Sequence, residues 1–151
     1  MKAYQFISLA LITLLVFSSC GKYEEGPDFS LRTKKKRLVG IWALNEFYEN
    51  GYAQNEISFF LLIQENSNWG NKRSRFEINY KLNTDPNIKG EWEFAKNKEV
   101  LRLRYYNNEN NQIHKMEDWR IMRLDNKFLA IEYEENENHY RMEFSKYNQL
   151  N

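Results

Sequence analysis

Apolar and polar residues alternate with a period of two through most of the chain beyond its N-terminal quarter. Phe76, Ile78 and Tyr80, for example, are separated by Glu77 and Asn79. Such alternation is the pattern of β-strands that bury one face and expose the other. Antiparallel sheets commonly show this asymmetry, whereas parallel sheets are usually buried on both faces. The pattern therefore predicts an all-β, antiparallel fold.

This rhythm predicts eight strands, which are separated by short polar turns such as Glu49-Asn50-Gly51. No helical stretch long enough for a crossover interrupts them, so consecutive strands should pair in sequence. Eight such strands can close into an up-and-down barrel, which leaves no exposed sheet edge. A half-open sandwich is the alternative. The expected strands are about 39–48, 56–64, 74–82, 88–95, 99–106, 113–124, 127–134 and 139–147.

Two segments depart from clean alternation. Residues 57–63 are apolar on both faces, so their outer face should pack on the segment before the barrel or on a partner. In the segment 113–124, the apolar face changes from the one that carries Trp119 to the one that carries Leu124. That change of face predicts a bulge or twist near Arg123.

The N-terminus has the features of an export signal. Lys2 is followed by an apolar stretch from Phe6 to Phe17, and the small residues Ser18 and Ser19 precede Cys20. The stretch is shorter than the roughly 20 residues of a membrane span and fits a signal-peptide core of about 7–15 residues. The segment resembles the lipobox of bacterial lipoproteins. The resemblance implies that the Cys20 thiol receives a diacylglycerol, that the signal is cleaved, and that the new amino terminus is acylated.

A plain secreted protein with one leftover thiol is the alternative to a lipoprotein. With lipidation, the chain divides into a signal peptide (1–19), the lipidated cysteine with a flexible tether (20–29) and the barrel domain (30–148). Ser30 is a suitable N-cap for a short helical turn that ends in the basic run Lys34-Lys35-Lys36-Arg37. This run either forms a solvated helix face beside the barrel or contacts anionic lipid headgroups.

The charge balance limits the possible partners. The chain carries 22 Lys and Arg residues against 21 Asp and Glu residues. This balance, together with export, argues against a nucleic-acid partner. Because Cys20 is the only cysteine, no disulfide is expected, and stability must come from packing of the abundant aromatic side chains.

The residues that could carry catalysis or bind a metal do not form a recognisable set. His114 and His139 lack metal-ligand spacing with a second histidine or a thiolate. No serine stands in a nucleophile-elbow context, and paired carboxylates such as Glu91 and Glu93 fall on the polar face of a strand. The sequence therefore predicts no enzyme, no cofactor and no metal site.

The first expected strand opens with Gly40-Ile41-Trp42, directly after the short helical segment. A second element of this kind, Gly90-Glu91-Trp92, opens the fourth strand. The mature domain resembles the lipocalins, which carry G-x-W at this place, and in particular the small lipocalin-like lipoproteins of the Gram-negative outer membrane. The resemblance implies that Gly40 and Trp42 belong to the closed base of the barrel. It also implies that a basic residue near the last strand, here Lys146, stacks on the tryptophan.

The inward-facing side chains are the candidate binding site. An eight-stranded barrel is just wide enough to be filled by side chains or to hold one small ligand. A cavity would be lined by the aromatic residues Tyr80, Trp92, Tyr105, Trp119 and Tyr133. We therefore expect a membrane-anchored lipoprotein of the bacterial envelope that binds a small apolar or amphipathic ligand. The alternative is a filled barrel whose apolar outer face, at Phe60 and Leu62, binds another envelope protein.

Overall fold

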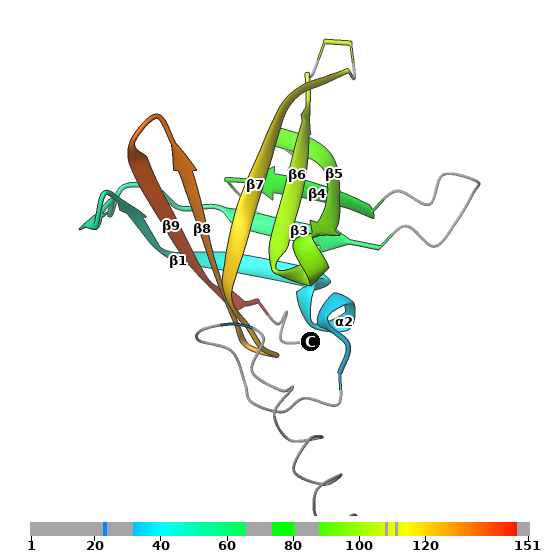
Figure 1. Cartoon of the computed structure of the whole chain (residues 1–151), viewed down its shortest axis with the longest axis horizontal. Helices are drawn as coiled ribbons and strands as arrows, with labels where there is room; N and C mark the ends of the chain where they lie inside the picture. Colours follow the sequence, from blue (N-terminus) through cyan, green and yellow to red (C-terminus); the bar gives the residue numbers. More distant parts are fainter. Residues whose placement is uncertain are drawn as a thin grey trace, which may run out of the picture.

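Eight antiparallel strands close into a barrel, which confirms the fold class that the alternation predicts (Figure 1). The computed structural model describes Tyr23 and residues 32–65, 74–80, 88–107, 109–110 and 112–147. Each strand pairs with its neighbour in sequence, and pairing of the first strand with the last, from Trp42 with Lys146 to Glu49 with Tyr140, closes the barrel. The strands are β1 (Gly40–Glu49), β3 (Phe60–Gln64), β4 (Ser74–Asn79), β5 (Ile88–Ala95), β6 (Val100–Tyr106), β7 (Ile113–Leu124), β8 (Phe128–Glu135) and β9 (Asn138–Lys146).

An additional short strand, β2 (Tyr52–Ala53), pairs with the end of β1. Asn50 and Gly51 between them have φ angles of 52° and 82°, as a two-residue hairpin turn requires. Because β2 already pairs with this end of β1, the following segment leaves the ladder and β3 begins at Phe60 rather than near residue 56. The outer face of β3 packs on Tyr147, the residue that follows β9. The rings of Phe60 and Tyr147 meet edge-on, with 5.4 Å between their centroids.

The bulge predicted near Arg123 is present in β7. Ile121 pairs with Ile131 of β8, but the next pair joins Arg123 to Ala130, so Met122 is the extra residue. One additional residue moves every later side chain to the other face of the strand. Met122 and Leu124 are consequently both buried, although a regular strand would place them on the opposite face from the inward-facing Ile121.

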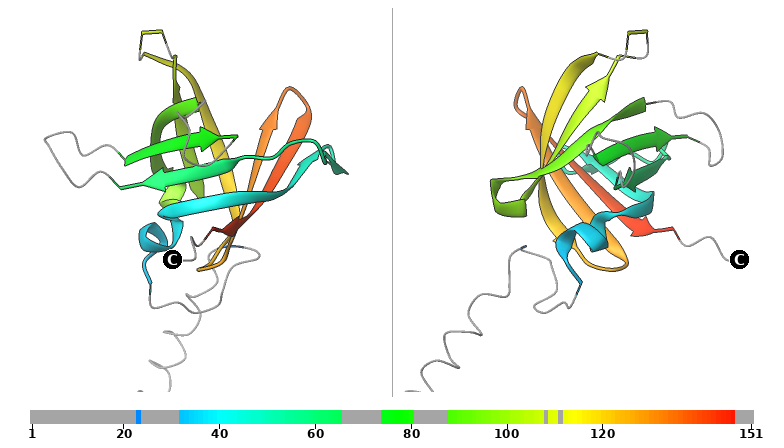
Figure 2. Two further views of the ribbon diagram at one scale, coloured as in Figure 1. Left: turned by 180° about the vertical axis from the view of Figure 1, so that it is seen from behind. Right: turned by 90° about the vertical axis from the view of Figure 1, so that its right-hand side faces the viewer.

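Helix α2 (Lys34–Leu38) precedes the barrel, and Thr33 is its N-cap, accepting a hydrogen bond from the backbone N–H of Lys36 at 3.3 Å. The expected cap, Ser30, lies outside the described residues, as do Cys20, the signal segment and all of the 20–29 segment except Tyr23. Figures 1 and 2 place α2 at the same end of the barrel as the β7–β8 turn and the last residues of β9. Within the described part of the chain, no helix has the length and apolarity that crossing a membrane would require.

The packed core occupies the half of the barrel next to α2. Most of the largest fully buried side chains come from α2 and from the strand ends on that side: Trp42, Phe144, Leu38, Ile63, Leu101, Leu124 and Leu129. Two others, Phe76 and Ile131, lie nearer the middle of their strands. Towards the other end the inward-facing side chains, such as Ile78, Tyr133 and Met142, are only partly buried. The barrel therefore has a closed, filled base and an opposite end at which a site can form.

Candidate functional site

The closed base is built around Trp42, whose side chain is fully buried. Its indole Nε1 donates a hydrogen bond to the carbonyl oxygen of Leu38, the last residue of α2, at 2.7 Å. The Lys146 ammonium lies 4.8 Å from the centroid of the indole ring. It also donates hydrogen bonds to the carbonyl oxygens of Arg37 and Val39, each at 2.8 Å. Lys146 thus connects the end of β9 to the helix and to the tryptophan.

The absence of a side chain at Gly40 leaves room for the Lys146 side chain. The φ angle of Gly40 is 144°, and a Cβ atom there would lie 2.6 Å from Cε of Lys146. Burial lowers the pKa of Lys146, with a smaller contribution from the charge of Arg32. The structure therefore brings Gly40, Trp42 and Lys146 together, and their contacts close the base rather than form a cavity.

Tyr23 is also fixed at this end. Its ring is buried, its hydroxyl donates to the carbonyl oxygen of Lys98 at 2.6 Å, and the ammonium of Lys34 lies 4.0 Å from its ring centroid. Burial raises the pKa of the Tyr23 hydroxyl. The chain three residues after Cys20 is consequently attached to the base of the barrel.

The opposite end contains an open cavity of about 690 Å³, within the usual range of ligand sites, roughly 300–1,000 Å³. A second cavity of about 230 Å³ adjoins it, and the two share Lys115, Glu117, Trp119 and Met142. We call the two cavities together the mouth. The larger cavity is lined by Ile57, Phe59, Ile78, Tyr80, Ile88, Tyr105, Tyr106, Asn107, Glu109, His114 and the four shared residues. The smaller one adds Tyr133, Glu135 and Tyr140.

The two sides of the mouth differ in polarity. The side formed by β4, β5 and the segment before β3 contributes apolar and tyrosine side chains, such as Ile57, Ile78 and Ile88. The charged groups of the larger cavity come from the β6–β7 hairpin, which extends beyond the other turns at this end (Figure 1). The mouth therefore suits a ligand with an apolar body and a polar end.

A row of aromatic rings crosses the wall formed by β7, β8, β9 and β1. The ring of Trp119 lies 5.1 Å from that of Tyr133, and Tyr133 lies 6.3 Å from Tyr140, measured between centroids. Phe47 extends the row, at 6.2 Å from Tyr140. Three members of this row, Trp119, Tyr133 and Tyr140, line the smaller cavity.

Glu117 places a carboxylate inside this aromatic wall, with a residue exposure of only 8%. Its Oε2 accepts hydrogen bonds from the Tyr105 hydroxyl at 2.5 Å and from Trp119 Nε1 at 2.9 Å. Its Oε1 lies 2.6 Å from the ammonium of Lys115. Burial and the neighbouring Glu117 charge raise the pKa of Tyr105, so its hydroxyl stays protonated as a donor. Buried carboxylates require such partners, and here the partners fix two aromatic rings and a lysine at the mouth.

Four of the five predicted cavity residues, Tyr80, Tyr105, Trp119 and Tyr133, lie at the mouth. The fifth, Trp92, lies further along β5 towards the base, where it donates a hydrogen bond from Nε1 to the carbonyl oxygen of Gln64 at 3.1 Å. Ile88 is the β5 residue at the mouth, and Trp92 lies four steps further along the strand, which corresponds to about 13 Å. Alternation assigns a face to each residue, but it does not give the height within the barrel.

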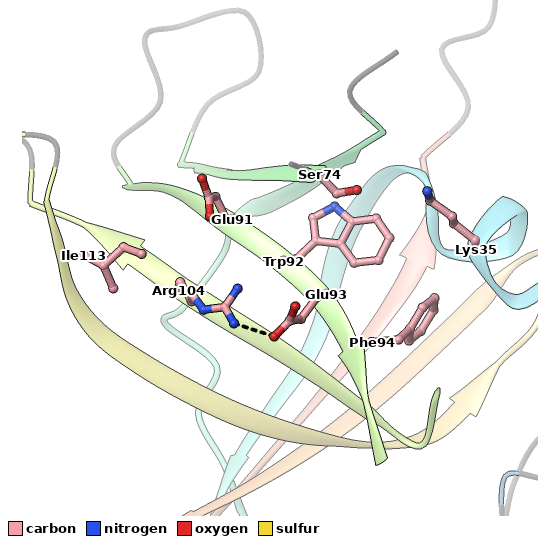
Figure 3. Close-up of a pocket in the computed structure, with 8 residues that line it drawn as sticks. All are labelled: Lys35, Ser74, Glu91, Trp92, Glu93, Phe94, Arg104 and Ile113. Carbon is pink, nitrogen blue, oxygen red and sulfur yellow. Dashed lines mark hydrogen bonds and ion pairs between the residues drawn. The ribbon is translucent and has the colours of Figure 1, made fainter. Parts of the chain in front are cut away.

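Trp92 instead borders a separate pocket of about 500 Å³ (Figure 3). Its indole lies near Ser74, and Glu93 and Arg104 point towards each other across β5 and β6 and form an ion pair. Arg102 extends this group through a two-pronged contact with Asp118, at 2.6 and 2.8 Å. These charges satisfy one another, so this pocket is a weaker candidate than the mouth.

Sequence reasoning missed the polar members of the mouth. Lys115 and Glu117 have the same parity as Trp119 and Ile121, so the alternation itself assigns them to the inward face. Charged residues at inward positions of an otherwise apolar strand face are thus the sequence feature that could have identified these polar members. Among the described residues, no cluster of three or more His, Cys, Asp or Glu side chains could hold a metal ion.

A comparison with models of protein families finds no match for this chain, and no curated protein sequence matches it. The closed eight-stranded barrel is compatible with a lipocalin-like fold.

Proposed function

We propose that the chain is a lipocalin-like lipoprotein of the bacterial envelope whose barrel mouth binds a small apolar or amphipathic ligand. The observation that carries this proposal is the contrast between the two ends of the barrel. The base is filled by Trp42 and its neighbours, whereas the mouth retains about 690 Å³ of space lined mainly by aromatic and aliphatic side chains. A ligand there removes apolar surface from water without having to open the core.

The attachment of Tyr23 to the base supports an orientation for the anchored protein. Cys20 is three residues from Tyr23, so an extended chain between them spans only about 10 Å. An acyl chain on Cys20 therefore keeps the base close to the bilayer. In the proposed arrangement, the mouth opens away from the outer membrane and receives its ligand from the aqueous side.

Binding of the neutral fluorophore N-phenyl-1-naphthylamine tests the ligand site. The fluorescence should rise saturably with one fluorophore per chain and should be lost in Met142→Trp, because Met142 lines both cavities. Lys89→Trp is the matched control, since Lys89 is exposed on the outer face of β5. Equal binding by both variants, or none by the wild type, would contradict a ligand site in the mouth.

Cell fractionation tests the anchor. We expect the wild-type protein in the membrane fraction and a Cys20→Ala variant in the soluble fraction. A variant that remained with the membrane would refute the proposed lipidation. Protease treatment of intact cells then separates a surface-exposed protein, which is degraded, from a periplasmic one, which is protected.

A second candidate function is an interaction module for another envelope protein. It is favoured by an apolar strip on the outer face, where Ile41 pairs with Leu62 and Phe60 packs on a Tyr147 that remains 39% exposed. A photo-crosslinking residue at position 62 should then capture one specific envelope protein in cells, whereas the same residue at position 89 should not. We propose binding rather than catalysis in both cases, because the buried carboxylate of the mouth, Glu117, is already held by three donors.

A further inference from the structure

The charged residues at the mouth determine which sign of charge the polar group of a ligand can carry. This inference rests on the proposed ligand-binding function. Among the described residues that line the two cavities, Glu109, Glu117 and Glu135 are acidic and Lys115 is the single lysine. No arginine lines either cavity within this part of the chain. The polar side of the mouth is therefore net negative. A ligand that carries a carboxylate or phosphate would meet like charges there.

Lys115 offers little compensation for an anionic ligand because its ammonium already has two acidic neighbours. It lies 2.6 Å from Oε1 of Glu117 and 3.8 Å from Oε2 of Glu135. Hydrogen bonding to Glu117 raises the pKa of Lys115, which keeps the lysine charged and bound to its partner. An anionic head group at Lys115 would share the ammonium with Glu117 and would add a third negative charge beside Glu117 and Glu135.

Glu135 differs from Glu117 in both exposure and contacts. Its side chain is 42% exposed, and its distance to Lys115 is longer than a hydrogen bond. It lines the smaller cavity together with the rings of Trp119, Tyr133 and Tyr140. A cation in this cavity would meet a carboxylate and aromatic rings at once, and both attract positive charge.

We propose that the mouth selects lipophilic amines, with the apolar chain of the ligand in the larger cavity and its ammonium group in the smaller one, beside Glu135, Tyr133 and Tyr140. The larger cavity supplies the apolar contacts of Ile57, Ile78 and Ile88. The same arrangement disfavours fatty acids, which have a similar apolar body but the opposite charge.

The test compares three probes that share one alkyl chain: octylammonium, octanol and octanoate. Each is titrated by calorimetry into the full-length protein in nanodiscs, with protein-free nanodiscs as the blank. We expect octylammonium to bind at least tenfold more tightly than octanoate, with octanol between them. Octanoate binding as tightly as octylammonium, or more tightly, would overturn the selectivity and leave the proposed ligand site intact. Binding of none of the three probes would overturn both.

Variants locate the selectivity at one side chain. Glu135→Gln should reduce the preference for octylammonium over octanoate to threefold or less while octanol binds as before. Glu134→Gln is the matched control, because Glu134 is the exposed neighbour and does not line either cavity. An unchanged preference in Glu135→Gln, or an equal loss in both variants, would overturn the assigned position of the ammonium group.

Discussion

Replacement of Lys146 by methionine should destabilise the barrel by about 2–4 kcal/mol. The ammonium donates to two carbonyl oxygens at 2.8 Å and lies over the Trp42 ring. A hydrogen bond from a charged group contributes about 1.5–3 kcal/mol, and a cation–π contact about 0.5–2 kcal/mol. The desolvation cost that disappears together with the partly buried ammonium offsets part of this sum. Methionine retains most of the apolar stem, so lost packing contributes little.

Urea-induced unfolding, followed by tryptophan fluorescence, measures this effect. The midpoint of Lys146→Met should fall while the slope of the transition stays unchanged, since the fold is retained. Lys89→Met is the matched control, because Lys89 is an exposed lysine on a strand, and it should change the stability by less than about 0.5 kcal/mol. A Lys146→Met protein as stable as this control would refute the assigned role of Lys146 in closing the base.

The pH dependence of the same comparison checks the environment of the ammonium. The pKa of Lys146 is lowered from 10.5 in the folded protein, first by burial and then by the charge of Arg32. Between the lowered value and 10.5, the unfolded chain binds more protons, so the wild type should gain stability relative to Lys146→Met as the pH rises. The tyrosines with raised pKa act alike in both proteins and cancel in the difference. A difference that does not change with pH would contradict the partly buried position of this ammonium.

Three further substitutions test other parts of the account. Glu117→Gln should lower the free energy of unfolding in urea by about 1–3 kcal/mol, because the charged acceptor of three donors is lost. A change below about 0.5 kcal/mol would contradict the role of Glu117. Gly90→Ala should cost about 3 kcal/mol in a thermal melt, because its Cβ would clash with the Arg104 carbonyl oxygen. An unchanged melting temperature would refute this contact. Arg102 lowers the pKa of Asp118 below 3.8. Asp118→Asn should therefore be less stable than the wild type at neutral pH, and this deficit should vanish as the pH falls through the lowered pKa. A deficit that persists in acid would contradict the pairing.

The fold could be predicted because its main determinant is local. Period-two alternation and short turns specify consecutive antiparallel pairing, and the change of face between Trp119 and Leu124 located the bulge in β7. The start of β3 could not be predicted in the same way. It depends on which segment pairs with the end of β1, and the Asn50-Gly51 turn places β2 there instead of the start of β3.

The candidate site was only partly predictable, for a related reason. Alternation states which side chains point inward, but register between distant strands decides how far each lies from the mouth. Trp92 and Tyr105 are both inward-facing, yet Tyr105 pairs with Lys115 at the mouth whereas Trp92 pairs with Ser74 and Leu103 further towards the base. The network of Glu117 depends on the same long-range register, because its partners come from two strands and three sequence positions.

Native mass spectrometry of the protein purified from its own cells tests the central claim most directly. We predict that the wild type retains a small molecule with one ligand per chain, and that Met142→Trp, which fills the mouth, retains none while it unfolds as cooperatively as the wild type. A wild-type protein without a bound molecule that also fails to bind N-phenyl-1-naphthylamine would contradict the claim that the mouth is a ligand site. Equal retention by Met142→Trp would contradict it as well.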